Sequence, residues 1–159
     1  MGLFDGVYSK GLSLGLAGGF VGTAVMDVIM VLTFVIAGQP ADVFFSAAGG
    51  KLGQGWVLGL VIHNMIGLAA GLTFAAFVLK IRPLRIDTMR KGLLMGVSYG
   101  AVTIPLGCIP LAIWLGEPIF EVVSFSFAPH LAYGTVLGAI VAYGLLRMAR
   151  PAAVAIREP

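Results

Sequence analysis

Charged side chains are scarce in this sequence of 159 residues. Asp, Glu, Lys and Arg make up 11% of it and hydrophobic residues 59%, whereas an ordinary globular chain carries about 25% charged residues. The composition excludes a soluble catalytic domain and a nucleic-acid-binding protein. The single cysteine excludes an internal disulfide and any Cys-rich zinc motif. No nucleotide-binding motif is present, and we expect no catalytic activity of the chain's own.

The few charges leave four long runs without them. Residues 11–41 contain one charged residue, Asp27, and residues 52–79, 92–116 and 122–146 contain none. Each run exceeds the roughly 20 apolar residues that cross a bilayer as a helix. The sequence therefore predicts an all-α fold, an integral membrane four-helix up-down bundle that forms a single transmembrane domain over residues 1–159. We expect helices at about 11–38, 54–79, 92–115 and 126–147, followed by a short basic tail at 148–159.

The positions of the basic residues predict an orientation. Nine of the ten Lys and Arg residues lie near the N-terminus, in residues 80–91 or near the C-terminus, and only Lys51 lies in the first loop. Positive residues favour the cytoplasmic side of a membrane. We therefore expect the chain in the inner or plasma membrane of the cell, with both termini cytoplasmic. Residues 80–91 would contact anionic lipids, and the apolar middle of the first loop, around Phe44, would lie along the outer interface.

The two halves of the sequence resemble each other. A shift of 67 residues aligns the second predicted helix with the fourth, and a shift of 81 aligns the first with the third. The first shift superimposes His63 on His130 and Gly67 on Gly134. The pattern predicts a duplicated helical hairpin, although glycine-rich helices also align by chance at a four-residue period.

Glycine is abundant, with 23 residues, and much of it recurs every fourth position. Lipid supplies no hydrophobic drive for helix association, so close approach over small residues must supply it. We expect helix packing through the following glycines: Gly15, Gly19, Gly22, Gly71, Gly96, Gly100 and Gly138. Glycine surfaces left over could contact another subunit or a flat prosthetic group.

Four polar residues occupy the predicted spans at one depth. Asp27, His63, Cys108 and His130 each lie 17 residues from a basic residue at the cytoplasmic end of their helix, which is about 25 Å along a helix. Polar groups at this depth are costly and need partners. In an up-down bundle the second and fourth helices are diagonal, so the two histidines could face each other.

Several interpretations of this layer are open. His63 and His130 could be axial ligands of a b-type haem, with Gly67 and Gly134 leaving room for the macrocycle. The four residues Asp27, His63, Cys108 and His130 could instead bind a copper or zinc ion.

A third interpretation needs no cofactor and is the one we favour. In it the layer is a hydrogen-bonded lock, or a proton-handling group, that includes Asn64. Pro129 would also suit the first turn of a helix, which would leave His130 at the outer interface.

Two prolines interrupt the third predicted helix. Pro105 and Pro110 each remove an amide donor and displace the carbonyl four residues back. We expect a kink or break in the outer half of this helix, with a pocket beside Cys108, because unwound backbone at membrane depth must be buried or line a cavity.

The stretch GGFVGTAVMDVIM at residues 18–30, the histidine early in the second helix and the HxxxG motif at His130 resemble small uncharacterised four-helix inner-membrane proteins of prokaryotes. The resemblance implies the architecture and no activity.

We expect a small accessory or structural subunit that packs into a larger membrane complex, or with itself as a homo-oligomer, in the lipid bilayer and without nucleic acid. The alternatives are a haem- or metal-binding redox module that uses His63 and His130, and a small channel or transporter along the Asp27 layer and the broken third helix.

Overall fold

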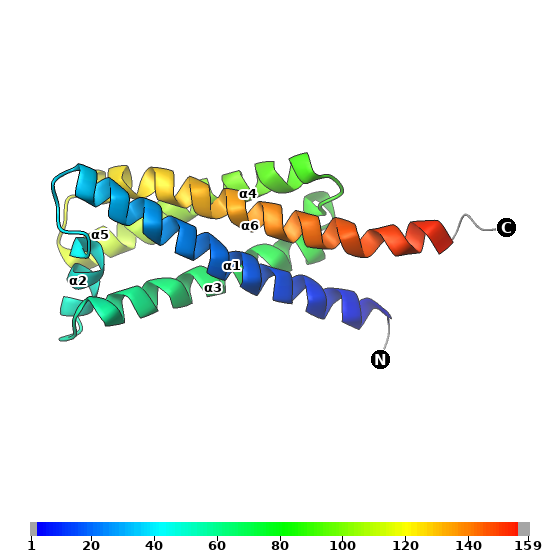
Figure 1. Cartoon of the computed structure of the whole chain (residues 1–159), viewed down its shortest axis with the longest axis horizontal. Coiled ribbons are helices and arrows are strands. Elements are labelled where there is room, and N and C mark those ends of the chain that lie inside the picture. Colours follow the sequence, from blue (N-terminus) through cyan, green and yellow to red (C-terminus); the bar gives the residue numbers. More distant parts are fainter. Residues whose placement is uncertain (1–2, 156–159) are drawn as a thin grey trace.

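The computed structural model of the chain describes residues 3–155 and consists of helices joined by short turns (Figure 1). The α-helices are α1 (Leu3–Ile36), α2 (Val43–Gly50), α3 (Trp56–Lys80), α4 (Met89–Thr103), α5 (Ile109–Leu115) and α6 (Ile119–Ala155). A 3₁₀ turn, η1 (Arg82–Leu84), lies between α3 and α4, and a π-helical turn, η2 (Ile104–Cys108), joins α4 to α5. The all-α prediction is confirmed.

Four helical stretches are long and apolar enough to cross a membrane: Tyr8–Ile36, Trp56–Lys80, Met89–Leu115 and Ile119–Ala149. They correspond to the four predicted helices. The predicted count of four was nevertheless wrong, because the first loop contains the additional helix α2. This helix packs on α3 and buries Phe45 and Ala48, so its apolar sequence is explained by contact with the bundle.

The start of the fourth long helix was also predicted wrongly. α6 begins at Ile119 rather than near residue 126 and continues through Ala155, into the predicted tail. Gly116 ends α5 in a left-handed conformation (φ 80°), and Pro118 accepts the first turn's hydrogen bond from the Glu121 amide at 3.0 Å. Pro129 therefore lies inside α6, and His130 is not at a helix end.

The break predicted in the third helix is present. α4 ends at Thr103, and the π-helical turn η2 contains Pro105, which has no amide hydrogen to continue the α-helical pattern. π-helical turns inside α-helices commonly accompany functional sites. Cys108 is the last residue of this turn and is buried.

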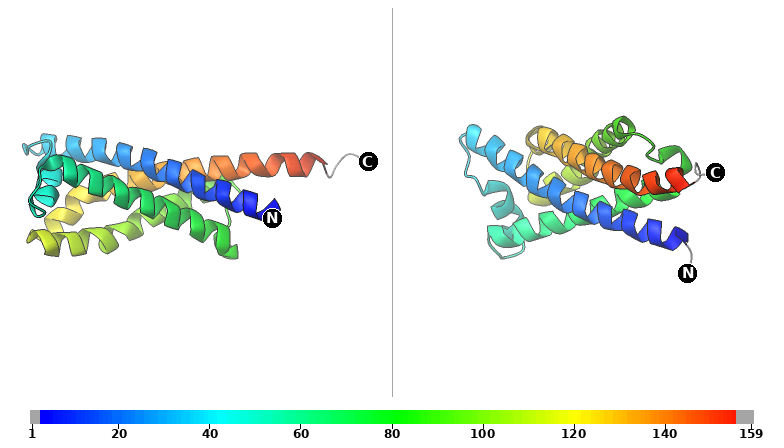
Figure 2. Two further views of the ribbon diagram at one scale, coloured as in Figure 1. Left: turned by 90° about the horizontal axis from the view of Figure 1, so that it is seen from below. Right: turned by 45° about the vertical axis from the view of Figure 1, so that its right-hand side comes forward.

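The long stretches run alternately up and down, with both termini at one end and α2 at the other (Figure 1). α1 packs closely against α3 and α6, and α6 also packs against α4. The two middle helices, α1 and α6, lie side by side, with α3 and α4 on their flanks (Figure 2). Within the described residues, close backbone packing between α3 and α4 is slight, so these two helices are bridged by side chains.

The close helix contacts are made by glycine. In the α1 and α3 pair, Gly15 and Gly19 contact Gly71, and in the α4 and α6 pair, Gly96 contacts Gly134 and Gly138. A β-carbon at any of these positions would overlap backbone atoms of the neighbouring helix. The predicted packing positions Gly22 and Gly100 also contact a neighbouring helix, at Tyr133 and at the His130 carbonyl respectively.

These contacts follow the internal similarity of the sequence. The contact between Gly15 and Gly71 and the contact between Gly96 and Gly138 are related by the shifts of 81 and 67 residues. The two hairpins therefore pack through equivalent glycines. Duplication itself stays a prediction.

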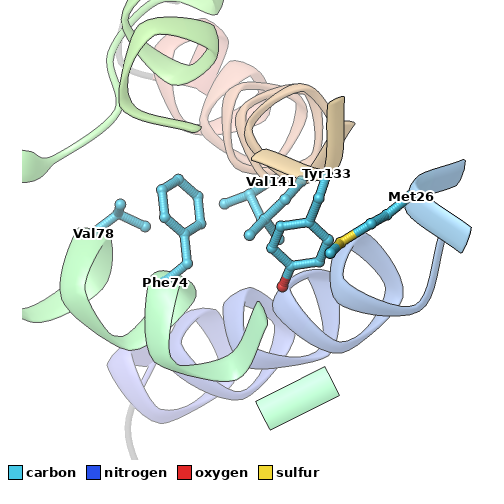
Figure 3. Close-up of a cluster of buried hydrophobic side chains, with 6 residues drawn as sticks. Met26, Phe74, Val78, Tyr133 and Val141 are labelled. Carbon is cyan, nitrogen blue, oxygen red and sulfur yellow. The ribbon is translucent and has the colours of Figure 1, made fainter. Parts of the chain in front are cut away.

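A cluster of buried hydrophobic side chains fills the middle of the bundle and extends toward the termini. It consists of Met26, Phe74, Val78, Tyr133, Leu137 and Val141. Figure 3 shows Phe74 and Val78 from α3 pointing toward Val141 and Tyr133 from α6. Tyr99 of α4 lies beside Phe74, with ring centroids 5.2 Å apart and the ring planes tilted by 55°, and it donates a hydrogen bond to the Ala70 carbonyl at 2.9 Å. Aromatic side chains thus fill the space where α3 does not meet α4 directly.

Two glycine substitutions in the stretch Met89–Leu115 distinguish the effect of helix packing on stability from the effect of helix propensity. Gly96→Ala should destabilise the protein by about 1–3 kcal/mol, because its methyl group would overlap α6. Gly107→Ala should be neutral or slightly stabilising, since nothing lies within 4 Å of its β-carbon and alanine favours helix by about 1 kcal/mol over glycine. Unfolding titrations in detergent micelles measure both, and equal effects would contradict the packing assignment.

Candidate functional site

A cavity of about 310 Å³ lies in the half of the bundle nearest α2. α1 and α6 form its base, α3 forms one wall, and η2 with its neighbours forms the other. Both histidines of the chain, His63 on α3 and His130 on α6, line this space, which we call the histidine cavity. The remaining lining side chains are mostly apolar and include Met26, Met30, Ile66, Leu106 and Leu111.

The polar group on the α3 side is a three-residue network. His63 Nδ1 lies 2.7 Å from Asp27 Oδ1, and Asn64 Nδ2 donates to Asp27 Oδ2 at 3.0 Å. The side chains of His63 and Asp27 are only 14% and 15% exposed. A carboxylate held by two donors is the form of buried acid that proteins tolerate. The network joins Asp27, His63 and Asn64, whereas the predicted lock also included His130, which has other partners.

The ring of His63 is held in one orientation. Asp27 fixes Nδ1, and the rings of Phe44 and Phe45 from α2 lie edge-on to the imidazole, at centroid distances of 5.4 and 5.8 Å. Within residues 3–155, Nε2 of His63 makes no hydrogen bond. Because a carboxylate only accepts, Nδ1 carries the hydrogen, and Nε2 of the neutral ring is an acceptor.

The polar group on the α6 side pairs an imidazole with a thiol. His130 Nδ1 donates to the Ser126 carbonyl at 2.8 Å, and Nε2 lies 3.9 Å from Cys108 Sγ. A thiol is a weak donor, so this contact is easily replaced. Here too Nδ1 is occupied and Nε2 is the nitrogen available to a ligand.

The two polar groups occupy equivalent positions in the two hairpins. The shifts of 81 and 67 residues convert the Asp27 and His63 pair into the Cys108 and His130 pair. His63, Cys108 and His130 line the cavity and Asp27 does not, and the single layer of all four stays a prediction.

The predicted metal site is not assembled as one cluster. In the part of the chain that the structure describes, no group of three or more His, Cys, Asp and Glu side chains is arranged to hold a metal ion. The side chains of Asp27, His63, Cys108 and His130 form two pairs instead.

The glycines predicted to leave room for a haem have other contacts. Gly134 packs on Gly96 and Gly100 of α4, so its assignment to haem clearance was wrong. Gly67 borders the cavity, but its Cα faces the Thr23 hydroxyl, and its carbonyl accepts a hydrogen bond from Tyr133 at 2.7 Å. Haem binding between the histidines stays a prediction that these glycines do not support.

Sequence analysis missed several residues of the cavity. Tyr133 closes the end toward the termini, and Phe44 separates His63 from the opposite end. Tyr133 lies three residues after His130, on the same side of a helix, and this spacing was a signal that could have been used. Ser126 stood at the predicted start of the fourth helix and was missed because its contact with His130 is made by its backbone carbonyl.

The histidine cavity is open at its side. Ile66 on α3 and Leu106 in η2 line it and are 62% and 70% exposed, so they mark an opening between α3 and η2. Toward the termini the lining ends at Tyr133 and Ala70, beyond which the buried cluster fills the bundle.

A second cavity adjoins the first at the α2 end. Its volume is about 290 Å³, and its polar lining residues include Gln39, Glu117 and Glu121. Phe44 and Ser126 line both cavities. We call this second space the acidic cavity.

The comparison with protein families gives a match over residues 9–151, to a family described as a family of unknown function, DUF6789. The chain belongs to this family. No curated protein matches it, and no solved structure matches it. The DUF6789 match covers α3 and almost all of α1 and α6, and so includes both histidine pairs.

The pairing of Asp27 with His63 is tested by a double-mutant cycle. The variants Asp27→Ala and His63→Ala and their combination should give a favourable coupling energy of about 1–3 kcal/mol, because each single change leaves the other buried group without its partner. Unfolding titrations in micelles measure the cycle. The matched control is the exposed pair of Asp42, the residue before α2, and Ser46 on α2, hydrogen-bonded at 2.7 Å, whose coupling should stay below about 0.5 kcal/mol. Equal coupling in the two cycles would contradict the assignment.

Proposed function

We propose that this protein spans a cell membrane with both termini on the cytoplasmic side and binds a membrane-soluble small molecule in the histidine cavity. The span is supported by four helices of sufficient length and hydropathy. The orientation is supported by the basic residues of the η1 region, which lie at the same end as the termini (Figure 1). In this orientation α2, the histidine cavity and the acidic cavity face the outer leaflet.

The orientation predicts which loops are accessible from outside the cell. In a Cys108→Ala background, a membrane-impermeant maleimide should label a Gln39→Cys variant in intact cells. An Asp87→Cys variant, in the loop after η1, should be labelled only after the membrane is opened. The opposite pattern would show that the termini face outward.

The observation that carries the binding proposal is the shape of the histidine cavity. Ligand sites are typically concave, mostly apolar and furnished with a few convergent polar groups, over about 300–1,000 Å³. The histidine cavity has this character, with two imidazoles among apolar side chains and a volume of about 310 Å³. Its opening between Ile66 and Leu106 lies on a flank of the bundle, where lipid would surround the protein. A ligand would therefore enter from the bilayer.

The closed inner end of the histidine cavity favours ligand binding over a channel function. A channel needs a path through the bundle, but the cavity ends at Tyr133, and the buried cluster fills the bundle beyond it. The channel and transporter alternative would require these side chains to move.

The accessory-subunit role and the homo-oligomer also stay predictions. They rested on glycine surfaces, and the predicted packing glycines contact helices of the same chain. The glycine pattern therefore gives no reason of its own to invoke a partner.

A substitution at the opening tests the binding proposal. Gly107 lines the cavity, and a β-carbon there would meet nothing within 4 Å, so Gly107→Trp should obstruct the opening without disturbing the fold. We expect the affinity for decylbenzene, measured in nanodiscs against empty nanodiscs, to fall at least tenfold.

The matched control is Gly6→Trp, since Gly6 also has open space around its β-carbon but lies far from the cavity on α1. Its affinity should equal that of the unmodified protein. Failure of the unmodified protein to bind decylbenzene above the empty-nanodisc background would remove the proposal.

A further inference from the structure

The polar atoms that the fold leaves free in the histidine cavity define the chemistry of a ligand, provided that the cavity binds one as proposed above. His63 Nε2 has no partner among the described residues, and His130 Nε2 has only a weak contact with the Cys108 thiol at 3.9 Å. Three of the hydroxyls that line the cavity, those of Thr23, Thr103 and Tyr133, are bonded to backbone carbonyls, and Ser126 adds a fourth hydroxyl. A ligand therefore meets two imidazole nitrogens, the Cys108 thiol and the Ser126 hydroxyl on a mostly apolar surface.

The tautomer of His63 favours a ligand that donates a hydrogen bond. Its Nδ1 hydrogen is directed at Asp27, so Nε2 of the neutral ring accepts a hydrogen bond and cannot donate one. A ligand hydroxyl satisfies this nitrogen. If the hydroxyl is acidic enough to transfer its proton, the resulting imidazolium is paired with the Asp27 carboxylate at 2.7 Å, and the pair becomes neutral overall.

The second imidazole indicates a second oxygen. His130 Nδ1 donates to the Ser126 carbonyl, so its Nε2 is likewise an acceptor in the neutral ring. His63 and His130 come from different helices and different hairpins, and they line one space. This arrangement suits a ring with a hydroxyl at each end better than a molecule with one polar end.

The size and surroundings of the cavity agree with a substituted ring. An apolar cavity of about 150 Å³ holds one benzene ring, and the histidine cavity has about 310 Å³. The opening at Ile66 and Leu106 leads toward lipid, where a hydrocarbon tail would extend. No Asp, Glu, Lys or Arg side chain of the described residues lines the cavity, so it offers no counter-charge to a charged headgroup.

The acidic cavity adds a property that a sterol or another neutral alcohol would not use. It meets the histidine cavity at Phe44 and Ser126 and carries Glu117 and Glu121. Phe44 also contacts the His63 ring. Two titratable side chains thus line a cavity that shares Phe44 with the histidine cavity. This arrangement suits proton exchange with a ligand that titrates.

We propose that the histidine cavity binds a membrane-soluble quinol, with one hydroxyl donating to His63 Nε2, the other to His130 Nε2 and the tail directed into the bilayer. Asp27 acts as a positioning residue, because it holds His63 in the tautomer whose Nε2 accepts. The binding step involves no electron transfer.

The test compares three ligands of similar shape on the full chain in nanodiscs: decylbenzoquinol, its dimethyl ether and decylbenzene. The dimethyl ether keeps the ring, the tail and both oxygens but has no hydroxyl to donate. The unmodified protein should bind the quinol at least tenfold more tightly than either of the other ligands. A tenfold difference corresponds to about 1.4 kcal/mol, which is the size expected for hydrogen bonding by the hydroxyls. This comparison needs no variant and does not depend on whether a variant folds.

A variant then assigns the selectivity to its residue. His63→Phe keeps a ring between Phe44 and Phe45 but removes the acceptor, so the affinity for the quinol should fall at least tenfold while the affinity for decylbenzene stays the same. Thr73→Ala is the matched control, since Thr73 is an exposed residue of the same helix that does not line the cavity and donates to the Ala69 carbonyl one turn away, and it should retain the preference for the quinol.

The outcomes separate the two proposals. Equal affinity for all three ligands would overturn the quinol assignment and leave the cavity as an apolar binding site. Selectivity that survives His63→Phe would overturn the assigned hydrogen bond. No binding of any ligand would remove the proposed function itself.

Discussion

The close approach of helix backbones at glycine is the constraint on which the rest of this structure depends. Helices in lipid gain no hydrophobic free energy from association, so they need dispersion contacts at short range. Gly15 and Gly19 against Gly71, and Gly96 against Gly138, provide these contacts in the two hairpins. Gly22 against Tyr133 and Gly18 against Leu137 bring α1 and α6 together, which joins the hairpins along one side only. The opposite side, between α3 and α4, is held by larger side chains such as Phe74 and Tyr99. The histidine cavity exists because this side is not closed by backbone contact.

The polar groups of the cavity follow from the same arrangement. A charged group in the bilayer centre costs about 2.5–3.5 kcal/mol on insertion scales, so Asp27 persists in an apolar helix only with partners. His63 and Asn64, on the neighbouring helix of the same hairpin, provide them. In the second hairpin the equivalent position holds Cys108. Burying a thiol in the membrane costs less free energy than burying a carboxylate, which is consistent with the weak contact of Cys108 to His130. The first pair thus acquires a fixed tautomer and a free acceptor, whereas the second keeps a replaceable contact. This difference gives the cavity its chemistry.

Much of this organisation follows from the sequence, and the errors have physical causes. The four long helices follow from charge-free runs, and the prediction that Asp27, His63, Cys108 and His130 share one depth follows from counting residues along helices. The segment before Pro129 was assigned to a loop because proline favours a first turn, but α6 accommodates Pro129 ten residues after its start. α2 was missed because a short helix at the end of a bundle has the same composition as an interfacial loop. The division of four polar residues into two pairs, and the assignment of Gly134 to packing rather than to a cofactor, depend on side-chain directions that helical spacing alone does not provide.

The central claim is that the space between α3, η2 and α6 holds one small molecule from the membrane. Native mass spectrometry of the full chain, released gently from its own membrane, tests this claim most directly. After collisional activation removes loosely attached lipid, the account predicts one retained small molecule per chain, which is absent from the Gly107→Trp variant and present in the Gly6→Trp variant. A spectrum with only the bare chain, or with the same adducts in both variants, would contradict it.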